Sequence, residues 1–341
     1  MKEFGYERPT QVRDALNTVA GTGGARFLAG GTNLVDLMKV GVEAPSRLVD
    51  VRFLGLDGIC RAPDGGLIIG AATTNSDVAA HPGVRRDFPA LSQAILAGAS
   101  GQLRNMATTG GNLLQRTRCP YFADPSQRCN KRTPNSGCAA IEGAHHNHAI
   151  FDWSDRCVAT QPSDMAVALA AFDAIVQFET LDGPGELPLS EFYLPVAGSP
   201  HLETALPPHA LITGVALPKS AIAAHSRYRK VRERASYAFA TVSVAAALEV
   251  EDGLVRGVRI GLGGVAARPW RARAAEAGLA GAPATGESFR RAADAELAAA
   301  RPLPGNGYKV ALARNLIEAV LSDLVGLSDD SHSPQSWETH Q

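Results

Sequence analysis

Residues 27–34 read FLAGGTNL, and this stretch decides the fold more than any other part of the chain. Its members are Phe27, Leu28, Ala29, Gly30, Gly31, Thr32, Asn33 and Leu34. The pattern predicts a short strand over residues 26–29 and a helix over residues 33–40. Because backbone amides at a helix N-terminus attract anions and glycines let a phosphate come close, the segment is a candidate phosphate-binding loop. A tight turn with a helix cap explains the same residues equally well, and the missing GxGxxG spacing argues against a Rossmann fold.

A second segment, over residues 108–113, repeats this order of hydroxyl, two glycines and amide. Its members are Thr108, Thr109, Gly110, Gly111, Asn112 and Leu113. Two such segments in one domain suggest two loops that close on one pyrophosphate. Two unrelated turns are the alternative.

Helical and strand patterns surround the two glycine segments. Further helices are predicted over residues 11–19, 88–97, 165–171, 271–279, 287–299 and 307–324. Further strands are predicted over residues 47–51, 67–69, 174–179, 227–232, 240–250 and 255–261, with a hairpin turn at residues 251–253. The prolines and glycines of residues 183–208 predict a linker with short turns. The polar residues 328–341 predict a loose tail.

The cysteines concentrate in one irregular segment. Four of the five, Cys119, Cys129, Cys138 and Cys157, fall within residues 116–160, whereas Cys60 stands alone and is expected to be a buried structural thiol. No CxxC pair is present, so an iron–sulfur cluster and a zinc ion fit the spacing about equally. Disulfides and free structural thiols are weaker alternatives. His145, His146 and His148 lie in the same segment and are expected to form an exposed polar turn, with metal ligation as the alternative.

The composition excludes several classes of function. A formal net charge of −1 over 341 residues gives no basic surface for nucleic acid or an anionic membrane. No apolar run reaches the roughly 20 residues of a membrane helix. Residues 1–10 contain no apolar core or cleavage site, so no signal peptide is predicted there.

The two glycine segments together resemble those of the FAD-binding medium subunits of the xanthine oxidase family of molybdenum hydroxylases. Residues 70–74, which end in Thr74, and residues 162–164 resemble other flavin-contacting segments of that family. Thr109 departs from the family pattern, where Ile or Leu is common. The resemblance covers nearly the whole chain up to the tail. It implies an α+β fold, with a two-subdomain FAD-binding domain over residues 1–220 and a C-terminal domain of a small sheet and helices over residues 224–327.

The cysteine segment limits the resemblance to a smaller group within that family, since most medium subunits lack such a segment. Its pattern is similar to that of the [4Fe-4S]-containing FAD subunits of periplasmic aromatic aldehyde oxidoreductases. The resemblance therefore implies that Cys119, Cys129, Cys138 and Cys157 ligate a [4Fe-4S] cluster. It also implies a large partner with the molybdenum cofactor and a small partner with two [2Fe-2S] clusters. Electrons would pass from these partners through FAD to an external acceptor.

The resemblance also implies roles for single residues. The first glycine segment, through residues 30–33, and the second, through Thr108, Gly110, Gly111 and Asn112, would bind the pyrophosphate. Asp164 would accept a hydrogen bond from a ribose or adenine-side hydroxyl, as carboxylates do in other dinucleotide sites. Lys230 would approach the flavin ring and favour its reduced, anionic form. A solvated strand lysine is the alternative for Lys230.

Three alternatives to the redox subunit remain at the level of sequence. A zinc-stabilised binding module would contain zinc and no flavin. A stand-alone flavin oxidase would need a substrate-side base or a covalent flavin link, for which no clear candidate exists. A flavoprotein subunit of a 4-hydroxybenzoyl-CoA reductase-like or xanthine dehydrogenase-like enzyme would share the cofactor site. The resemblance implies the periplasm if the small partner carries an export signal, and the cytoplasm otherwise.

Overall fold

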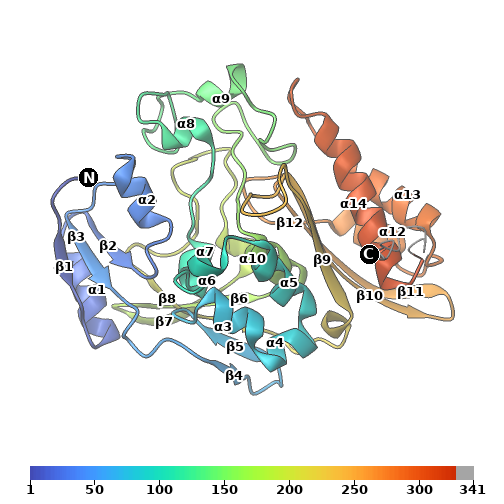
Figure 1. The fold of residues 1–341 in the computed structure, drawn as a ribbon, viewed down its shortest axis with the longest axis horizontal. Coiled ribbons are helices and arrows are strands. Elements are labelled where there is room, and N and C mark those ends of the chain that lie inside the picture. Colours follow the sequence, from blue (N-terminus) through green and yellow to red (C-terminus); the bar gives the residue numbers. More distant parts are fainter. Residues whose placement is uncertain (328–341) are drawn as a thin grey trace, which may run out of the picture.

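The computed structural model describes residues 1–327. The tail predicted for residues 328–341 lies outside the described residues. The described chain builds three sheets, with helices packed between and around them (Figure 1). The α+β class predicted from the sequence is confirmed.

The first sheet carries the first glycine segment. Its parallel strands, in spatial order, are β1 (Gly5–Glu7), β3 (Arg47–Asp50) and β2 (Ala25–Leu28). The connections contain α1 (Val12–Gly21) and α2 (Leu34–Lys39). Ala15, Leu16 and Val19 form the buried face of α1, at the spacing that puts residues on one side of a helix. The predicted elements in this region are confirmed to within two residues, and the glycines lie between β2 and α2.

The second sheet is antiparallel. Its strands, in spatial order, are β4 (Ile59–Arg61), β5 (Leu67–Gly70), β8 (Leu211–Leu217), β6 (Ile175–Thr180) and β7 (Gly183–Pro188). The linker predicted over residues 183–208 is wrong in its first part, because β7 is followed directly by α11 (Leu189–Phe192). β7 pairs only with β6 at the edge of the sheet. An edge strand tolerates proline because its outer N–H groups need no partner strand.

Cys60 is not the buried thiol that was expected. It lies on the edge strand β4, opposite Ile68, and it is exposed. Leu67 and Ile69, the neighbours of Ile68 on β5, point into the core. Side chains alternate along a strand, so this register puts Cys60 on the outer face of the sheet.

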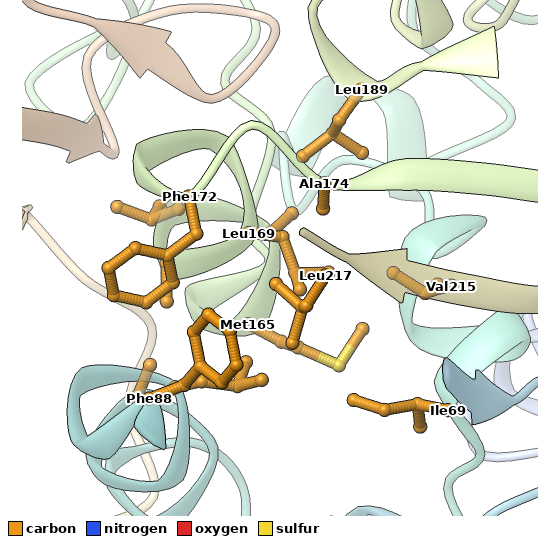
Figure 2. Packing of buried hydrophobic residues seen from close by; sticks show 14 of the residues in the cluster. Ile69, Phe88, Met165, Leu169, Phe172, Ala174, Leu189, Val215 and Leu217 are labelled. Atoms are coloured by element: carbon orange, nitrogen blue, oxygen red, sulfur yellow. The ribbon is translucent and has the colours of Figure 1, made fainter. Parts of the chain in front are cut away.

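A cluster of buried side chains joins the second sheet to the central helices. These helices are α3 (Asn75–Ala80), α4 (Pro82–Asp87), α5 (Pro89–Ala97), α6 (Gly101–Arg104), α7 (Thr109–Leu113) and α10 (Asp164–Ala171). Figure 2 shows Phe88, Met165 and Phe172 gathered beside Leu217 of β8. The rings of Phe88 and Phe172 meet edge to face with centroids 5.4 Å apart. Each large side chain buried here stabilises the fold by about 1.5–3 kcal/mol.

The third sheet lies between two cores. Its antiparallel strands, in spatial order, are β12 (Trp270–Arg271), β11 (Leu254–Gly263), β10 (Val242–Glu251) and β9 (Ser226–Val231). Its helices are η1 (Ile222–Ala224), α12 (Arg273–Leu279), α13 (Gly286–Leu297) and α14 (Tyr308–Leu324). Along β10, Ala245 and Ala247 join the core of the central helices, whereas Val244 and Ala246 join the core under α12–α14. The hairpin turn is confirmed, since Asp252 and Gly253 have φ of 53° and 74°.

The cysteine segment rises at the top of Figure 1, above the central helices. The irregular structure predicted for it is interrupted by two helices of one turn, α8 (Pro120–Ala123) and α9 (Ala139–Glu142). Backbone bridges join Cys129 to Cys138 and Ser154 to Cys157. Main-chain pairing thus holds three of the four cysteines of this loop, Cys129, Cys138 and Cys157.

Candidate functional site

The two glycine segments come together, as predicted. A Cβ added to Gly30 would lie 1.8 Å from the carbonyl oxygen of Met106, so only glycine allows this approach. Gly31 has φ of 72°, a left-handed conformation that favours glycine. The second segment is also joined to residues 70–75, because Thr109 N–H donates to the carbonyl of Thr73 at 3.0 Å and Gly110 N–H to that of Ala71 at 2.9 Å.

Three residues of the second segment fix its shape. The Thr108 hydroxyl caps α7 by accepting from Gly111 N–H at 3.3 Å. The buried Thr109 hydroxyl donates to the carbonyl of Thr73 at 3.2 Å. A Cβ on Gly110 would lie 3.2 Å from the Cβ of Ala71, so this glycine allows close packing. These residues hold the loop, and Gly111 and Asn112 line the space beside it.

That space is a cleft of about 630 Å³, called the cleft below. Six of the predicted cofactor residues line it: Thr32, Asn33, Gly111, Asn112, Asp164 and Lys230. The other ten do not line it: Phe27, Leu28, Ala29, Gly30, Gly31, Leu34, Thr74, Thr108, Thr109 and Gly110. Thr74 caps α3 instead, where its hydroxyl accepts from Asp77 N–H. The structure thus separates residues that face the cleft from residues that shape its walls.

Four buried polar atoms on the cleft wall have no hydrogen-bond partner within the described residues. They are Asn33 Nδ2, Asn75 Oδ1, His148 Nδ1 and Ser243 Oγ. Asn33 Oδ1 already accepts from Arg116 N–H at 2.9 Å, so its amide nitrogen remains as a donor. A buried polar group without a partner costs about 1–3 kcal/mol. The donor set therefore fits a polar ligand with phosphate and hydroxyl groups.

Sequence reasoning missed three of these four residues. Asn75 follows the Thr73-Thr74 pair, and its place beside that segment is the signal that was available. Ser243 is the one polar side chain among Val242, Val244 and the alanines of β10. No local pattern distinguishes His148 from its two neighbouring histidines.

Asp164 and Lys230 form a buried ion pair in the cleft wall. Lys230 Nζ lies 2.7 Å from Asp164 Oδ2, and the Tyr228 hydroxyl donates to Asp164 Oδ1 at 2.5 Å. Burial raises the pKa of Asp164, while the charge of Lys230 opposes this shift. The alternative of a solvated Lys230 is wrong, because its side chain is only 3% exposed. Both Asp164 oxygens thus have protein partners, and a cofactor hydroxyl would share them.

The four clustered cysteines line one small cavity, called the thiol cavity below, together with Lys131 and Arg156. None of these four cysteines forms a disulfide in the structure. Among residues 1–327 no three His, Cys, Asp or Glu side chains are grouped closely enough to hold a single metal ion. Cys119 lines both the thiol cavity and the cleft.

Burial disfavours the ionised form of two thiols in this cavity. Burial raises the pKa of Cys119 to about 11 and that of Cys157 to about 12, although the charge of Lys131 lowers the latter. A buried thiolate without a partner is therefore unfavourable. A bound metal supplies the missing positive charge and deprotonates the thiols it ligates. The chemistry of the donor set fits a metal–sulfur group.

The histidines of the cysteine segment divide into two kinds. His146 is exposed, as predicted, and lies 3.5 Å from Glu233. His148 is buried, and its Nε2 lies 3.2 Å from Cys119 Sγ, so the exposed turn predicted for it is wrong. Burial, followed by the charge of Lys309, lowers the pKa of His148 to about 4. His148 is therefore neutral at physiological pH.

Lys309 of α14 ties the cysteine segment to the third sheet. It is fully buried, and its Nζ donates to the carbonyls of Asn147, His148 and Gly264 at 3.2, 2.9 and 2.5 Å. Gly264 and the two loop residues also line the cleft. One side chain of α14 thus joins two segments that line the cleft.

Replacing Lys309 with methionine is expected to destabilise the chain. The carbonyls lose their donor, so the free energy of unfolding at pH 7 falls by about 2 kcal/mol or more. Burial lowers the pKa of Lys309 to about 7 from an ordinary value of 10.5. Between pH 7 and pH 10.5 the unfolded chain binds more protons at Lys309 than the folded chain does. The contribution of Lys309 to stability therefore rises with pH. Denaturant unfolding measures the difference in free energy of unfolding between the wild type and Lys309→Met. This difference should be larger at pH 9 than at pH 7, and a smaller difference at pH 9 would contradict the prediction.

Comparison with known sequences shows the family. Residues 2–220 match the model of the FAD binding domain in molybdopterin dehydrogenase, and residues 216–324 match the CO dehydrogenase flavoprotein C-terminal domain. The chain is 51% identical to the aldehyde oxidoreductase FAD-binding subunit PaoB of Escherichia coli (strain K12), over 95% of this chain and 98% of that protein. It is 26% identical to the carbon monoxide dehydrogenase medium chain of Hydrogenophaga pseudoflava, over 94% of this chain and 96% of that protein.

Solved structures agree with these matches. The carbon monoxide dehydrogenase of Hydrogenophaga pseudoflava aligns with a TM-score of 0.74 at 26% identity, over 95% of this chain and 98% of that chain. Quinoline 2-oxidoreductase from Pseudomonas putida 86 aligns with a TM-score of 0.75 at 22% identity, over 96% and 99% of the two chains, which shows the shared fold. The fold is thus that of a flavoprotein subunit of a molybdenum hydroxylase. The chain belongs to the FAD-binding medium subunits of the xanthine oxidase family and is a subunit of an oxidoreductase.

Proposed function

We propose that this chain is the electron-transferring FAD and [4Fe-4S] subunit of a molybdenum-containing aldehyde oxidoreductase. The observation that carries the proposal is the position of Cys119, which lines both the thiol cavity and the cleft. A metal–sulfur group held by Cys119 would therefore adjoin the flavin site. The 51% identity to a protein named as an aldehyde oxidoreductase FAD-binding subunit supports the choice of substrate class.

The cleft residues would hold FAD by polar contacts. Asn33 Nδ2 would donate to a pyrophosphate oxygen, and Gly111 and Asn112 would approach it from the second segment. Asp164 and Tyr228 would contact a hydroxyl of the cofactor, and Lys230 would set a positive charge beside it. When bound, FAD supplies the ability to take up electrons in pairs and release them.

The thiol cavity would hold the cluster through Cys119, Cys129, Cys138 and Cys157. A four-iron cluster is wider than a single ion, so its four ligands stand farther apart than those of a zinc site. Lys131 is buried beside the cavity, where it would offset the negative charge of a thiolate-bound cluster. When bound, the cluster supplies one-electron transfer.

The proposal includes partners and an organisation of the chain. A large subunit would carry the molybdenum cofactor and a small subunit two [2Fe-2S] clusters, and electrons would pass from them through FAD to an external acceptor. The FAD-binding domain would span residues 1–220, with the cluster loop at residues 116–160, and the C-terminal domain would span residues 224–327. The described helices include none that is long and apolar enough to cross a membrane. The complex would reach the periplasm if the small subunit carries an export signal, and otherwise stay in the cytoplasm.

Anaerobic mixing with an aromatic aldehyde tests this function. In the assembled complex the aldehyde should bleach the flavin absorbance, because the partner oxidises the aldehyde and two electrons reach FAD. The isolated chain should stay oxidised with the same aldehyde, since its cleft contains no site for aldehyde oxidation in this account. Bleaching of the isolated chain indicates a stand-alone flavin enzyme, and an unbleached complex argues against an aldehyde as substrate.

A further inference from the structure

We propose that His148 is a positioning residue for Cys119. Its Nε2–H donates a hydrogen bond to the Cys119 sulfur, holds that ligand between the thiol cavity and the cleft, and raises the reduction potential of the cluster. This inference rests on the proposed [4Fe-4S] function. It identifies the hydrogen bond from His148 to Cys119 as a contact that sets the reduction potential of that cluster.

The contact is short and buried. His148 Nε2 lies 3.2 Å from Cys119 Sγ, within hydrogen-bond distance for sulfur. Within residues 1–327, His148 is the only side chain that makes a hydrogen bond to one of the four clustered cysteine sulfurs. A ligating thiolate can only accept, so Nε2 of His148 must carry the proton of this hydrogen bond. His148 Nδ1 makes no hydrogen bond within the described residues, so Nε2 makes the one hydrogen bond of the ring there.

The main chain fixes the imidazole in place. The His148 carbonyl accepts from Lys309 Nζ at 2.9 Å and from Asn306 Nδ2 at 3.2 Å. Lys309 and Asn306 are both fully buried. The backbone that carries the ring is thus held by α14 and the turn before it, independently of the cysteines. A donor that does not depend on the cluster for its position can orient a ligand.

The hydrogen bond should favour the reduced cluster. One-electron reduction adds negative charge to the cluster and its thiolate sulfurs. A hydrogen bond to sulfur stabilises the more negative state, and such bonds are among the factors that set iron–sulfur potentials. Loss of the donor should therefore lower the potential without removing a ligand.

Redox titration of the cluster, followed by electron paramagnetic resonance in the anaerobically purified full-length chain, tests this inference. His148→Leu should shift the reduction equilibrium about tenfold, which is about 59 mV to lower potential for a one-electron couple. His148→Gln places an amide N–H near the Nε2 position and should restore most of the wild-type potential. His145→Gln is the matched control, because His145 bonds Ala140 and Gly305 and no cysteine. Its potential should equal that of the wild type.

A wild-type potential in His148→Leu overturns the inference, and so does a potential in His148→Gln as low as in the leucine variant. If His148→Leu retains no iron, its potential cannot be measured, and a measurement on the wild-type chain tests the inference instead. After labelling with ¹⁵N-histidine, pulsed resonance should detect coupling between the reduced cluster and one histidine nitrogen, and its absence overturns the inference. Wild-type chain without any iron refutes the proposed function itself, so the two failures are distinguishable.

Discussion

Gly30→Ala should leave the purified chain with less than a tenth of the FAD bound by the wild type. The added Cβ would lie 1.8 Å from the Met106 carbonyl oxygen, whereas real Cβ contacts stay beyond 3.0 Å. The two glycine segments must therefore move apart, and Asn33 and Gly111 no longer face one ligand across the cleft. A tenfold loss in affinity corresponds to about 1.4 kcal/mol, and we expect the displacement of this backbone to cost more than that. FAD released by denaturation and counted per chain measures the effect.

Gly101→Ala is the control for this prediction. Gly101 lies in α6 near the second glycine segment, and a Cβ there meets nothing within 4 Å. This variant should keep its FAD and, because alanine favours helices, should not be destabilised. Full FAD occupancy in Gly30→Ala would show that the meeting of the two segments is not what builds the site.

Cys157→Ser should remove most of the iron while FAD remains bound. Cys157 is buried and lines the thiol cavity, and it does not line the cleft. A serine hydroxyl has nearly the same shape but is a poor ligand for an iron–sulfur cluster, which takes four thiolates. Iron and FAD assayed on the same anaerobic preparation separate the two cofactors.

The exposed Cys60 provides the matched substitution. It lies on β4, outside the thiol cavity, so Cys60→Ser should retain both iron and FAD. Equal iron in the two serine variants would mean that Cys157 is not a ligand. Loss of FAD together with iron in Cys157→Ser would mean that the cysteine segment is needed to build the cleft.

Short-range chemistry made much of this site predictable. The glycine segments can be recognised in the sequence because a tight turn next to a helix needs glycine within a few residues. The four clustered cysteines stand out for a similar reason, since they crowd into one irregular segment. The helix α1 and the hairpin at Asp252 and Gly253 follow from local periodicity and turn chemistry.

The features that could not be predicted from the sequence depend on contacts between residues far apart in the chain. The ion pair of Asp164 with Lys230 joins α10 to β9, which are far apart in the sequence. The hydrogen bond from Tyr228 to Asp164 joins the same two elements. The buried environment of His148 depends on Lys309, far along the chain. The prolines of β7 suit a loop and an edge strand alike, and only the pairing of β7 with β6 distinguishes the two.

The most direct test of the account is the iron and FAD content of the full-length chain purified anaerobically, together with its visible spectrum. We expect flavin bands over a broad iron–sulfur shoulder, with about four iron atoms per chain for a single [4Fe-4S] cluster and about one FAD per chain for the flavin site. Flavin without iron after anaerobic reconstitution would contradict the cluster. Zinc without flavin would contradict the whole account.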